Sequence, residues 1–414
     1  MYLKLIWEMW AKPMRAPQIM GKWHKALAAL VTAIFVVSCA SSGPRMAVPD
    51  DLISQASVTG MTQIRFWGDQ SPPNLNEIIK EKFVQMRTSR PRMVKAGARP
   101  ILNFLAISGG GSDGAFGAGL LSGWSARGTR PEFEIVTGIS TGALIAPFAF
   151  LGKRYDPVIK EIYTSYTTKD FLIKRPLKGL VGGEALASSA PFQRLIAKYV
   201  TTALLAEIAK ENNRGRRLLI GTTNLDAQRP VIWDAGKIAA SGHPQALDLL
   251  RKIFLASASI PGAFPPVFID VTADGKVFQE MHVDGGTTTQ VFLMPSQLMV
   301  KDIDRKTRVR ARRTVYVIRN GRLNPETAPV RDRTLSIASR SISTLIKNQG
   351  NGDLYRLHSF SRRNNMRFKL SYIPAEFKNT STEVFDKDYM NKLFDLGYQL
   401  GRAGYKWKTT PPGF

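Results

Sequence analysis

The pattern of apolar and polar residues becomes regular at Pro100. Residues 101–107 (ILNFLAI) form a nearly continuous apolar run, which is typical of a strand buried on both faces of a parallel sheet. Residues 115–124 predict a helix, residues 135–137 a second strand, and residues 141–151 an apolar, buried helix. This alternation predicts an α/β fold with a mostly parallel central sheet.

The alternation continues toward the C-terminus. Apolar residues recur at helical spacing from 246 to 257, and residues 278–283 predict a strand. The other predicted elements are strands at 63–67, 218–222, 231–233 and 315–318 and helices at 76–85, 156–166, 191–209, 332–348 and 386–403. We expect the face of the last helix that carries Tyr389 and Leu393 to be buried, and the segment 167–190 to be irregular.

Four segments follow from these patterns. We expect a leader at residues 1–38, a linker and N-terminal extension at 39–99, the main α/β domain at 100–320, and a C-terminal helical extension at 321–414 that packs on the main domain. The second segment is rich in Pro, Ser, Gly and Arg and lacks long periodic runs. With 414 residues, the chain is long enough for a sizeable core.

The leader has the features of a secretory signal. Residues 26–37 are apolar, follow Lys22 and Lys25, and precede small residues; a run this short cannot span the roughly 30 Å of a bilayer. Residues 36–39 (VVSC) resemble the bacterial lipobox, whose cysteine is acylated and becomes the mature N-terminus. Cys39 is the only cysteine, and the alternative interpretation is a small buried side chain. We predict a protein of the bacterial cell envelope, anchored through Cys39 on the periplasmic side or in the outer membrane.

Composition adds an expected partner. Hydrophobic residues make up 44% and charged residues 22% of the chain, as in globular proteins, and the formal net charge is +26. Such a charge favours nucleic acid or anionic lipid. Loss of residues 1–38, with five basic residues and one acidic residue, leaves +22. Because a secreted, anchored chain rarely meets nucleic acid, the charge predicts an anionic membrane surface and no nucleic acid.

The sequence Gly138-Ile139-Ser140-Thr141-Gly142 lies between a predicted strand and a predicted helix. This order is that of a nucleophile elbow, in which a sharp turn presents a serine and small flanking residues allow a close backbone approach. The helix that follows directs its positive end and free N–H groups at the reacting centre. Ser140 is therefore the candidate nucleophile.

A second glycine turn follows the strand at 101–107 and allows two interpretations. Gly109, Gly111 and Gly114 fit the dinucleotide fingerprint G-x-G-x-x-G, with Glu132 and Glu134 about 20 residues further on. Alternatively, the N–H groups of three consecutive glycines, 109–111, point at an oxyanion. A fingerprint explains neither the third consecutive glycine nor the serine turn, so we favour the oxyanion hole.

The base that would activate Ser140 is either a histidine or an aspartate. His24 lies in the leader, and His243 and His358 lie in polar, loop-like surroundings without a signature. His282 stands two residues before Asp284, on the same face of the predicted strand. A triad would use His282, whereas a dyad would use Asp284 directly. An aspartate with a pKa near its usual value of about 3.9 is a poor base, so a dyad requires Asp284 to be desolvated.

Four ordered motifs carry a resemblance to a known family. They are Gly109–Gly114 (GGGSDG), Gly138–Gly142 (GISTG), Ala258–Pro266 (ASIPGAFPP) and Asp284–Gly286 (DGG). In this order they look like the patatin-like phospholipase family, over roughly residues 100–320. The resemblance implies a three-layer α/β/α fold with a mostly parallel central sheet.

The resemblance also implies roles for these residues. It makes Ser140 the nucleophile and Asp284 the base of a catalytic dyad, and it places Gly109, Gly110, Gly111 and the N–H of Thr141 at the oxyanion hole. The expected substrate is a phospholipid or another acyl-ester lipid. No metal-ligand cluster or calcium loop is visible in the sequence, so we expect no cofactor. The alternative is a catalytically silent lipid-binding or scaffold protein of the same fold.

Two positions depart from the pattern of the family. Many members have Arg or Lys where this chain has Asp113, and many have Asp where this chain has Ser108. A carboxylate beside an oxyanion hole would oppose catalysis. We therefore expect Asp113 to turn away from the site or to cap the helix that follows.

Overall fold

The computed structural model describes residues 45–413 with gaps at 96, 175–186, 296, 379–380 and 382. The leader and Cys39 lie outside the described residues, so the predictions about them stay predictions. Residues Ala47–Phe414 form one unit by their internal contacts. Among the described residues, no helix is both long enough and apolar enough to cross a bilayer.

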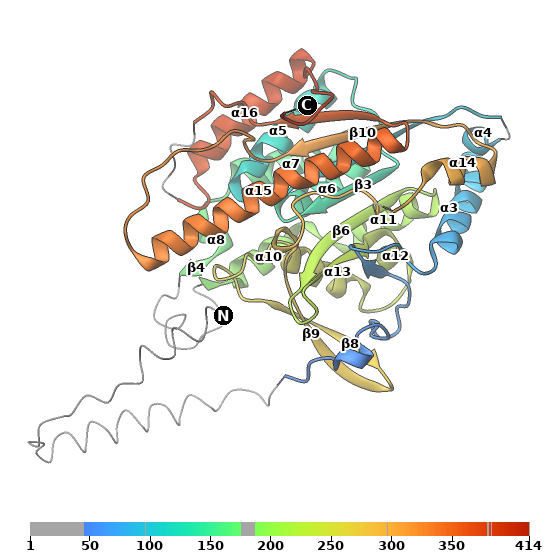
Figure 1. Cartoon of the computed structure of the whole chain (residues 1–414), viewed down its shortest axis with the longest axis horizontal. Helices are drawn as coiled ribbons and strands as arrows, with labels where there is room; N and C mark the ends of the chain where they lie inside the picture. The colour runs from blue at the N-terminus through green and yellow to red at the C-terminus, as the bar shows by residue number, and fades with distance from the viewer. Residues whose placement is uncertain are drawn as a thin grey trace, which may run out of the picture. The chain divides into compact units, whose positions relative to one another are not determined.

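A nine-stranded sheet lies at the centre of the described chain (Figure 1). Its main path runs β1 (Arg65–Trp67), β7 (Arg229–Asp234), β6 (Arg217–Asn224), β3 (Ile135–Ile139), β2 (Ile101–Ile107), β10 (Arg312–Arg319) and β11 (Arg367–Tyr372). The strands from β6 to β11 are parallel, whereas β7 and β1 are antiparallel additions at one edge. The predicted, mostly parallel α/β sheet is confirmed.

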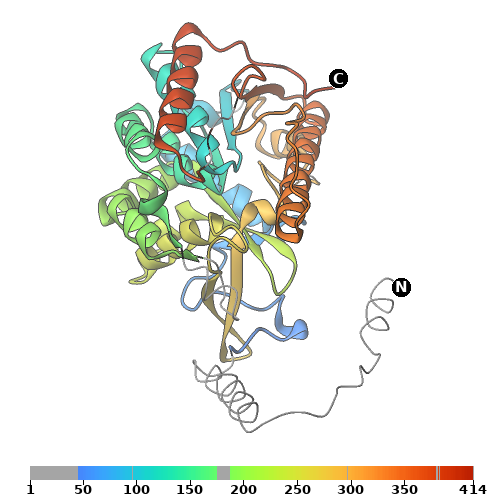
Figure 2. The ribbon, with the colours of Figure 1, turned by 90° about the vertical axis from the view of Figure 1, so that its left-hand side faces the viewer.

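Two further strands branch from this path. β9 (Lys276–Asp284) pairs antiparallel with the end of β6, and β8 (Val267–Ala273) pairs with β9. The two strands extend beyond the rest of the sheet as a ribbon (Figures 1 and 2). A separate short pair is formed by β4 (Ile173–Lys174) and β5 (Ala187–Ser188).

Helices cover both faces of the sheet and enclose two cores. Alternate residues of β2 point to opposite faces: Leu105 and Ile107 belong to one core, Phe104 and Ala106 to the other. The first face carries α5 (Gly114–Ala126), α6 (Thr141–Leu151), α7 (Asp156–Thr164), α10 (Ala190–Tyr199), α11 (Thr202–Asn213), α12 (Ala235–Ala240), α13 (Ala246–Ser257) and α16 (Lys387–Ala403). The second carries α14 (Val300–Thr307) and α15 (Thr334–Arg363). Figure 2 shows α15 and α16 on opposite sides of the sheet, so three layers result.

Glycines bring α16 into close contact with α5. A Cβ added at Gly119 would lie 2.0 Å from the carbonyl oxygen of Phe394, and one at Gly397 would lie 2.4 Å from that of Phe116. Only residues without a side chain permit such a backbone approach. The predicted core face of α16 is confirmed at Tyr389 and Leu393, which are buried.

Several elements differ from the sequence-based expectations. The single helix expected at 191–209 is divided, because Thr201 caps a new helix by accepting a hydrogen bond of 3.2 Å from the N–H of Leu204. The helix expected at 332–348 continues to Arg363, so His358 lies buried in a helix and not in a loop. Residues 321–414, expected as helices, also supply β11.

Candidate active site

Ser140 occupies a tight turn between β3 and α6. Its backbone has φ 55° and ψ −124°, a left-handed φ that is uncommon for a residue with a side chain. A Cβ added at Gly138 would lie 2.4 Å from the carbonyl oxygen of Gly142, and one at Gly142 would lie 2.3 Å from that of Ile107. Both glycines are therefore required by the turn, as the elbow pattern predicts.

The last residue of α13, Ser257, holds the turn in place through hydrogen bonds. The N–H of Ser140 donates to Oγ of Ser257 at 3.0 Å, and that hydroxyl donates to the carbonyl oxygen of Gly221 at 2.7 Å. Ser257 thus ties the strained turn to β6. The role of Ser257 depends on which strand end that helix meets.

The register of β6 brings Ser140 and Asp284 together. β3 pairs with β6 until Ile139 lies opposite Gly221, where the chain turns at Ser140. On the same side of β6, β9 arrives from the other direction and ends with Asp284 opposite Thr222, one residue further along. Residues 144 positions apart in the sequence therefore meet, and the Ser140 side chain lies close enough to the Asp284 carboxylate to lower its pKa.

The Asp284 carboxylate is desolvated. It is only 5% exposed, and its Oδ1 accepts a hydrogen bond of 2.7 Å from the N–H of Gly286. Its own N–H donates to the carbonyl oxygen of Ser259 at 2.9 Å, so the motif Ala258–Pro266 helps to fix the strand end. Burial raises the pKa of Asp284 to about 7, against the lowering effect of the hydrogen bonds from Ser140 and Gly286. This is the property that a base requires near neutral pH.

His282 is directed elsewhere. It is fully buried, with Nδ1 3.0 Å from Oγ1 of Thr222 and Nε2 3.0 Å from a carboxylate oxygen of Glu280. Glu280 in turn pairs with Arg65. Burial lowers the pKa of His282, although the hydrogen bond to Glu280 raises it in part. Both ring nitrogens are thus engaged away from Ser140, which favours Asp284 as the base.

The glycine turn lies beside Ser140, since a Cβ added at Gly109 would be 3.2 Å from that of Ser140. The N–H of Gly109 donates to the carbonyl oxygen of Gln290 at 3.1 Å and is therefore occupied. Gly110 packs against Asn320, where an added Cβ would lie 2.1 Å from the carbonyl oxygen. Gly111 has φ 57° and lines the pocket at Ser140.

Thr141 supplies the remaining candidate donor. It is the first residue of α6, and the first N–H groups of a helix have no intrahelical acceptor. Its hydroxyl lies 2.5 Å from the hydroxyl of Tyr163, which donates to the carbonyl oxygen of Thr141 at 2.9 Å. Tyr163 fixes the start of α6 and was not singled out in the sequence.

Asp113 turns away from the glycine turn. Its carboxylate accepts a hydrogen bond from the hydroxyl of Tyr389 in α16 and lies 3.9 Å from a guanidinium nitrogen of Arg322. It makes no side-chain cap to the helix that follows. Burial raises the pKa of Asp113, against the lowering effect of Tyr389 and Arg322. Of the two expected solutions, the chain uses the first.

Ser108 is held by residues at the end of β10. Its hydroxyl accepts a hydrogen bond of 2.8 Å from the N–H of Asn320 and lies 3.2 Å from a guanidinium nitrogen of Arg319. The same nitrogen of Arg319 donates to the carbonyl oxygen of Gly109 at 3.2 Å. Because the carboxyl ends of parallel strands share one edge of the sheet, the predicted strand at 315–318 could have pointed to both residues.

The position of Glu134 argues against the dinucleotide interpretation, in which an acidic residue binds the ribose. Glu134 is paired with the guanidinium of Arg90 through two hydrogen bonds of 2.7 Å. It precedes β3 and so lies at the opposite end of that strand from Ser140. A ribose bound at the glycine turn could not reach this carboxylate.

An apolar pocket adjoins Ser140, and we name it the Ser140 pocket. Its walls include Gly111, Thr141, Leu144, Phe171, Phe264 and Met390. A second apolar pocket shares Leu144, Ile162, Phe171 and Phe192 with it and continues toward Tyr199. Apolar walls with few polar groups are suited to an alkyl chain. Among the described residues, no group of three His, Cys, Asp or Glu side chains is arranged to hold a metal ion.

The three-layer fold, the serine elbow and the adjoining apolar pocket together have the arrangement that serine hydrolases use. Comparison with known proteins gives the family: residues 105–295 match the family model of patatin-like phospholipases. This part of the chain, which contains Ser140, Asp284 and the glycine turn, is therefore a domain of the patatin-like phospholipase type.

Two solved structures are distantly similar to the chain. VipD from Legionella pneumophila has 12% sequence identity and a TM-score of 0.38, over 74% of this chain and 67% of that one. The structure of full-length SpcU in complex with full-length ExoU from the type III secretion system of Pseudomonas aeruginosa has 14% identity and a TM-score of 0.27, over 73% and 52%. No curated protein matches the sequence.

Proposed function

We propose that the chain is a serine acyl hydrolase that cleaves carboxylic ester bonds of phospholipids or lysophospholipids through a dyad of Ser140 and Asp284. The observation that carries the proposal is the meeting of β3 and β9 along one side of β6, which sets a desolvated carboxylate against the serine of the elbow. The apolar Ser140 pocket supports an acyl chain as the group transferred.

The chemistry proceeds in two halves. Asp284 accepts the proton of the Ser140 hydroxyl while Oγ bonds to the ester carbonyl carbon, and the N–H groups of Gly110, Gly111 and Thr141 stabilise the oxyanion. The tetrahedral species expels the alcohol, which takes the proton from Asp284, and an acyl-serine remains. Water then loses a proton to Asp284 and attacks the acyl carbon. As the bond to Oγ breaks, Asp284 returns that proton to Oγ, so the carboxylic acid, the Ser140 hydroxyl and the Asp284 carboxylate result.

The test is acyl release from a panel of phospholipids, lysophospholipids and simple esters, with Ser140→Ala as the control. We expect hydrolysis of at least one lipid class by the parent and none by the variant. Labelling of the folded protein with a fluorophosphonate separates the alternatives: a Ser140 that never reacts would contradict the hydrolase and support the catalytically silent lipid-binding protein.

The anchor belongs to the same proposal. Acylation at Cys39 in the bacterial envelope would hold the active site near its substrate, and the positive charge of the chain favours an anionic membrane surface. Cys39→Ala is expected to abolish lipidation and to raise the mass of the product because the leader is retained. An unchanged mature mass with continued partition into detergent would contradict the anchor.

A further inference from the structure

A separate cavity lies on the other face of the sheet, at the opposite end of β3. It has a volume of about 250 Å³ and lies between α3 (Leu75–Ser89), α14 and the strands β2, β3 and β6, and we name it the α3 cavity. Ile135 at the start of β3 lines it, whereas Ser140 follows the end of the same strand. At about 3.3 Å per residue, the two sites are separated by the length of the strand, roughly 13 Å.

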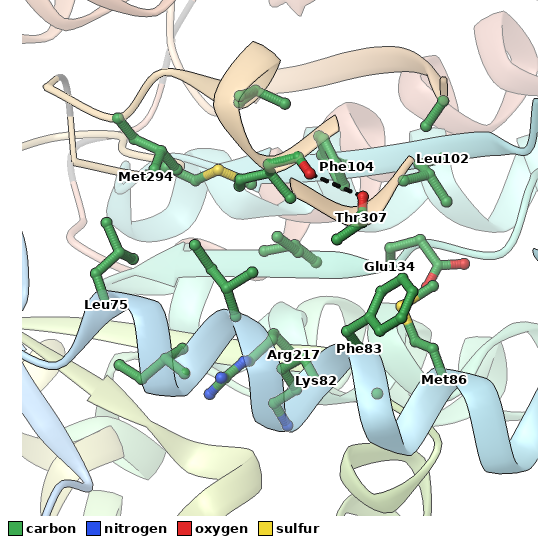
Figure 3. A pocket seen from close by; sticks show the side chains of 18 of the residues that line it. Leu75, Lys82, Phe83, Met86, Leu102, Phe104, Glu134, Arg217, Met294 and Thr307 are labelled. Carbon is green, nitrogen blue, oxygen red and sulfur yellow. Dashed lines mark hydrogen bonds between the residues drawn. The ribbon is translucent and has the colours of Figure 1, made fainter. Parts of the chain in front are cut away.

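The helix α3 turns an apolar face to this cavity. Ile78, Ile79, Phe83 and Met86 line it at helical spacing, and each is only partly buried. None of these four side chains belongs to either apolar core. Figure 3 shows Leu75, Phe83 and Met86 of α3 on one side of the cavity and Leu102 and Phe104 of β2 on the other. An apolar cavity of about 150 Å³ is already large enough to bind benzene.

The charged side chains in the wall have partners, although Nη2 of Arg217, whose Nη1 pairs with Asp234, makes no hydrogen bond. Glu134 pairs with Arg90, and Asp304 pairs with Arg313 at 2.8 Å. Lys82 donates to Oδ1 of Asn212 at 2.6 Å, and its amine is turned away from the apolar space (Figure 3). Burial lowers the pKa of Lys82 to about 6, so this amine requires no counter-ion at neutral pH. The interior therefore suits an alkyl chain better than a polar metabolite.

The segments that form one end of the cavity are strongly basic. Residues 91–100 and 300–313 run side by side, joined by hydrogen bonds from Gly97 N–H to Arg308 and from Arg310 N–H to Ala98. Val309 and Ala311 line the cavity, while the residues that alternate with them are exposed arginines. Exposed basic side chains in the two segments are Arg92, Lys95, Arg99, Lys301, Arg305, Lys306, Arg308, Arg310 and Arg312. The acidic residues described there are Asp302, which pairs with Arg305 at 3.1 Å, and Asp304, which pairs with Arg313.

We propose that the α3 cavity is a lipid-binding site, separate from the active site, that takes the alkyl chain of an anionic lipid while the basic segments 91–100 and 300–313 attract its head. An apolar chamber with paired internal charges selects the chain, and nine exposed cations beside it select a negative head. The proposal does not depend on hydrolysis, because none of the residues involved touches Ser140.

The experiment uses the full chain with Ser140→Ala, which prevents turnover, and dodecanoate as the probe in isothermal titration calorimetry. Ile79→Trp fills the cavity from α3, and Ala311→Phe fills it from the opposite wall. We expect each to weaken dodecanoate binding at least tenfold. The matched control is Val84→Trp, because Val84 is in the same helix and is 44% exposed. This variant should bind dodecanoate as the parent does.

One further variant and one further measurement guard against misassignment. Leu144→Trp fills the Ser140 pocket and should leave dodecanoate binding unchanged. The proposal is overturned if Leu144→Trp loses dodecanoate binding while Ile79→Trp and Ala311→Phe keep it. Thermal melting identifies a variant that fails to fold, and binding retained by both folded cavity variants also overturns it.

The charge requirement is tested separately. Dodecanol should bind at least tenfold more weakly than dodecanoate, and the combined variant Arg99→Glu, Arg310→Glu, Arg312→Glu should lose this preference. Reversal of Lys153, Lys276 and Lys378, exposed elsewhere, is the control. Equal binding of dodecanoate and dodecanol would overturn the proposal that the site prefers a negatively charged head.

Sedimentation with phosphatidylglycerol vesicles identifies the source of the lipid. If the parent associates with the vesicles and Ile79→Trp does not, the ligand is a membrane lipid. If the parent binds dodecanoate but does not associate with the vesicles, the ligand is a free fatty acid.

Discussion

The two ends of β3 are built on opposite principles. At the carboxyl end, Gly138 and Gly142 leave no room for one added carbon, and Ser140 is held by hydrogen bonds to backbone and side chains. At the amino end, Ile135 borders a cavity of about 250 Å³ whose apolar walls do not meet. A site that stabilises a transition state requires fixed atoms, whereas a site that accommodates an alkyl chain requires space. Substitutions at the two ends of β3 should therefore have different effects.

The largest expected effect is at the carboxyl end. Asp284→Asn removes the base while keeping an oxygen that can accept from Gly286, so acyl-ester hydrolysis should fall by about 10²- to 10⁴-fold. The comparison is with His282→Gln, on the same strand two residues earlier, which should keep the activity of the parent. Initial rates per mole of folded protein provide the measurement. If His282→Gln is as inactive as Asp284→Asn, histidine and not aspartate is the base.

Ionised Asp284 should also lower the free energy of unfolding. The buried carboxyl keeps its proton up to a pH of about 7, whereas the unfolded chain loses it near pH 4. The folded state therefore binds more protons between these values, and the contribution of Asp284 to stability falls as pH rises through this range and is constant above it.

Asp284→Asn lacks this loss. At pH 8 the variant should be more stable than the parent by roughly 2 to 4 kcal/mol, at about 1.4 kcal/mol for each unit of pKa, and the difference should vanish near pH 4. Urea unfolding at both pH values checks the prediction. The activity of the parent should rise with pH through about 7 as Asp284 ionises. A variant less stable than the parent at pH 8 would show that the charge is compensated.

One added methyl group compares the packing of the two ends. Gly142→Ala drives a Cβ toward the carbonyl oxygen of Ile107 and should lower the free energy of unfolding by about 1 to 3 kcal/mol. Ala311→Val, in the wall of the α3 cavity, adds carbon to empty space and should be neutral or stabilising. Chemical denaturation of both variants decides. Equal destabilisation would mean that the amino end is as closely packed as the carboxyl end.

The carboxyl end was largely predictable and the amino end was not. β2 and α6 have the bounds that the apolar runs predict, because glycine turns mark the strand ends. The meeting of Ser140 with Asp284 follows from the order of motifs, but its cause, the register of β9 on β6, is not visible in either segment. Ser257, Arg319 and Tyr389 were missed as supports because their roles depend on which elements cross in space.

The α3 cavity shows the converse. The pattern of residues 76–85 predicts a helix, and α3 forms over 75–89 with one face toward the cavity. Nothing in that pattern states that the face meets a void, because periodicity reports which residues avoid water and not how closely their partners approach. The sequence shows that basic residues are frequent at 305–313. It does not show that they lie beside an apolar cavity, because the cavity forms only in the tertiary structure.

The smallest expected effect concerns the support of the glycine turn from outside the matched family region. Tyr389→Phe removes the hydroxyl that binds Asp113, leaving that buried carboxylate with Arg322 at 3.9 Å. The turn then loses a fixed neighbour, and kcat should fall by up to about tenfold, the equivalent of roughly 1.4 kcal/mol, while KM changes little because Tyr389 lies outside the lining of the Ser140 pocket. Tyr398→Phe, in the same helix, is the matched control and should keep the parent kcat. If both variants lose activity equally, α16 acts through general stability. A selective loss in Tyr389→Phe would show that the fixed geometry of the carboxyl end extends to a helix nearly a hundred residues beyond the matched region.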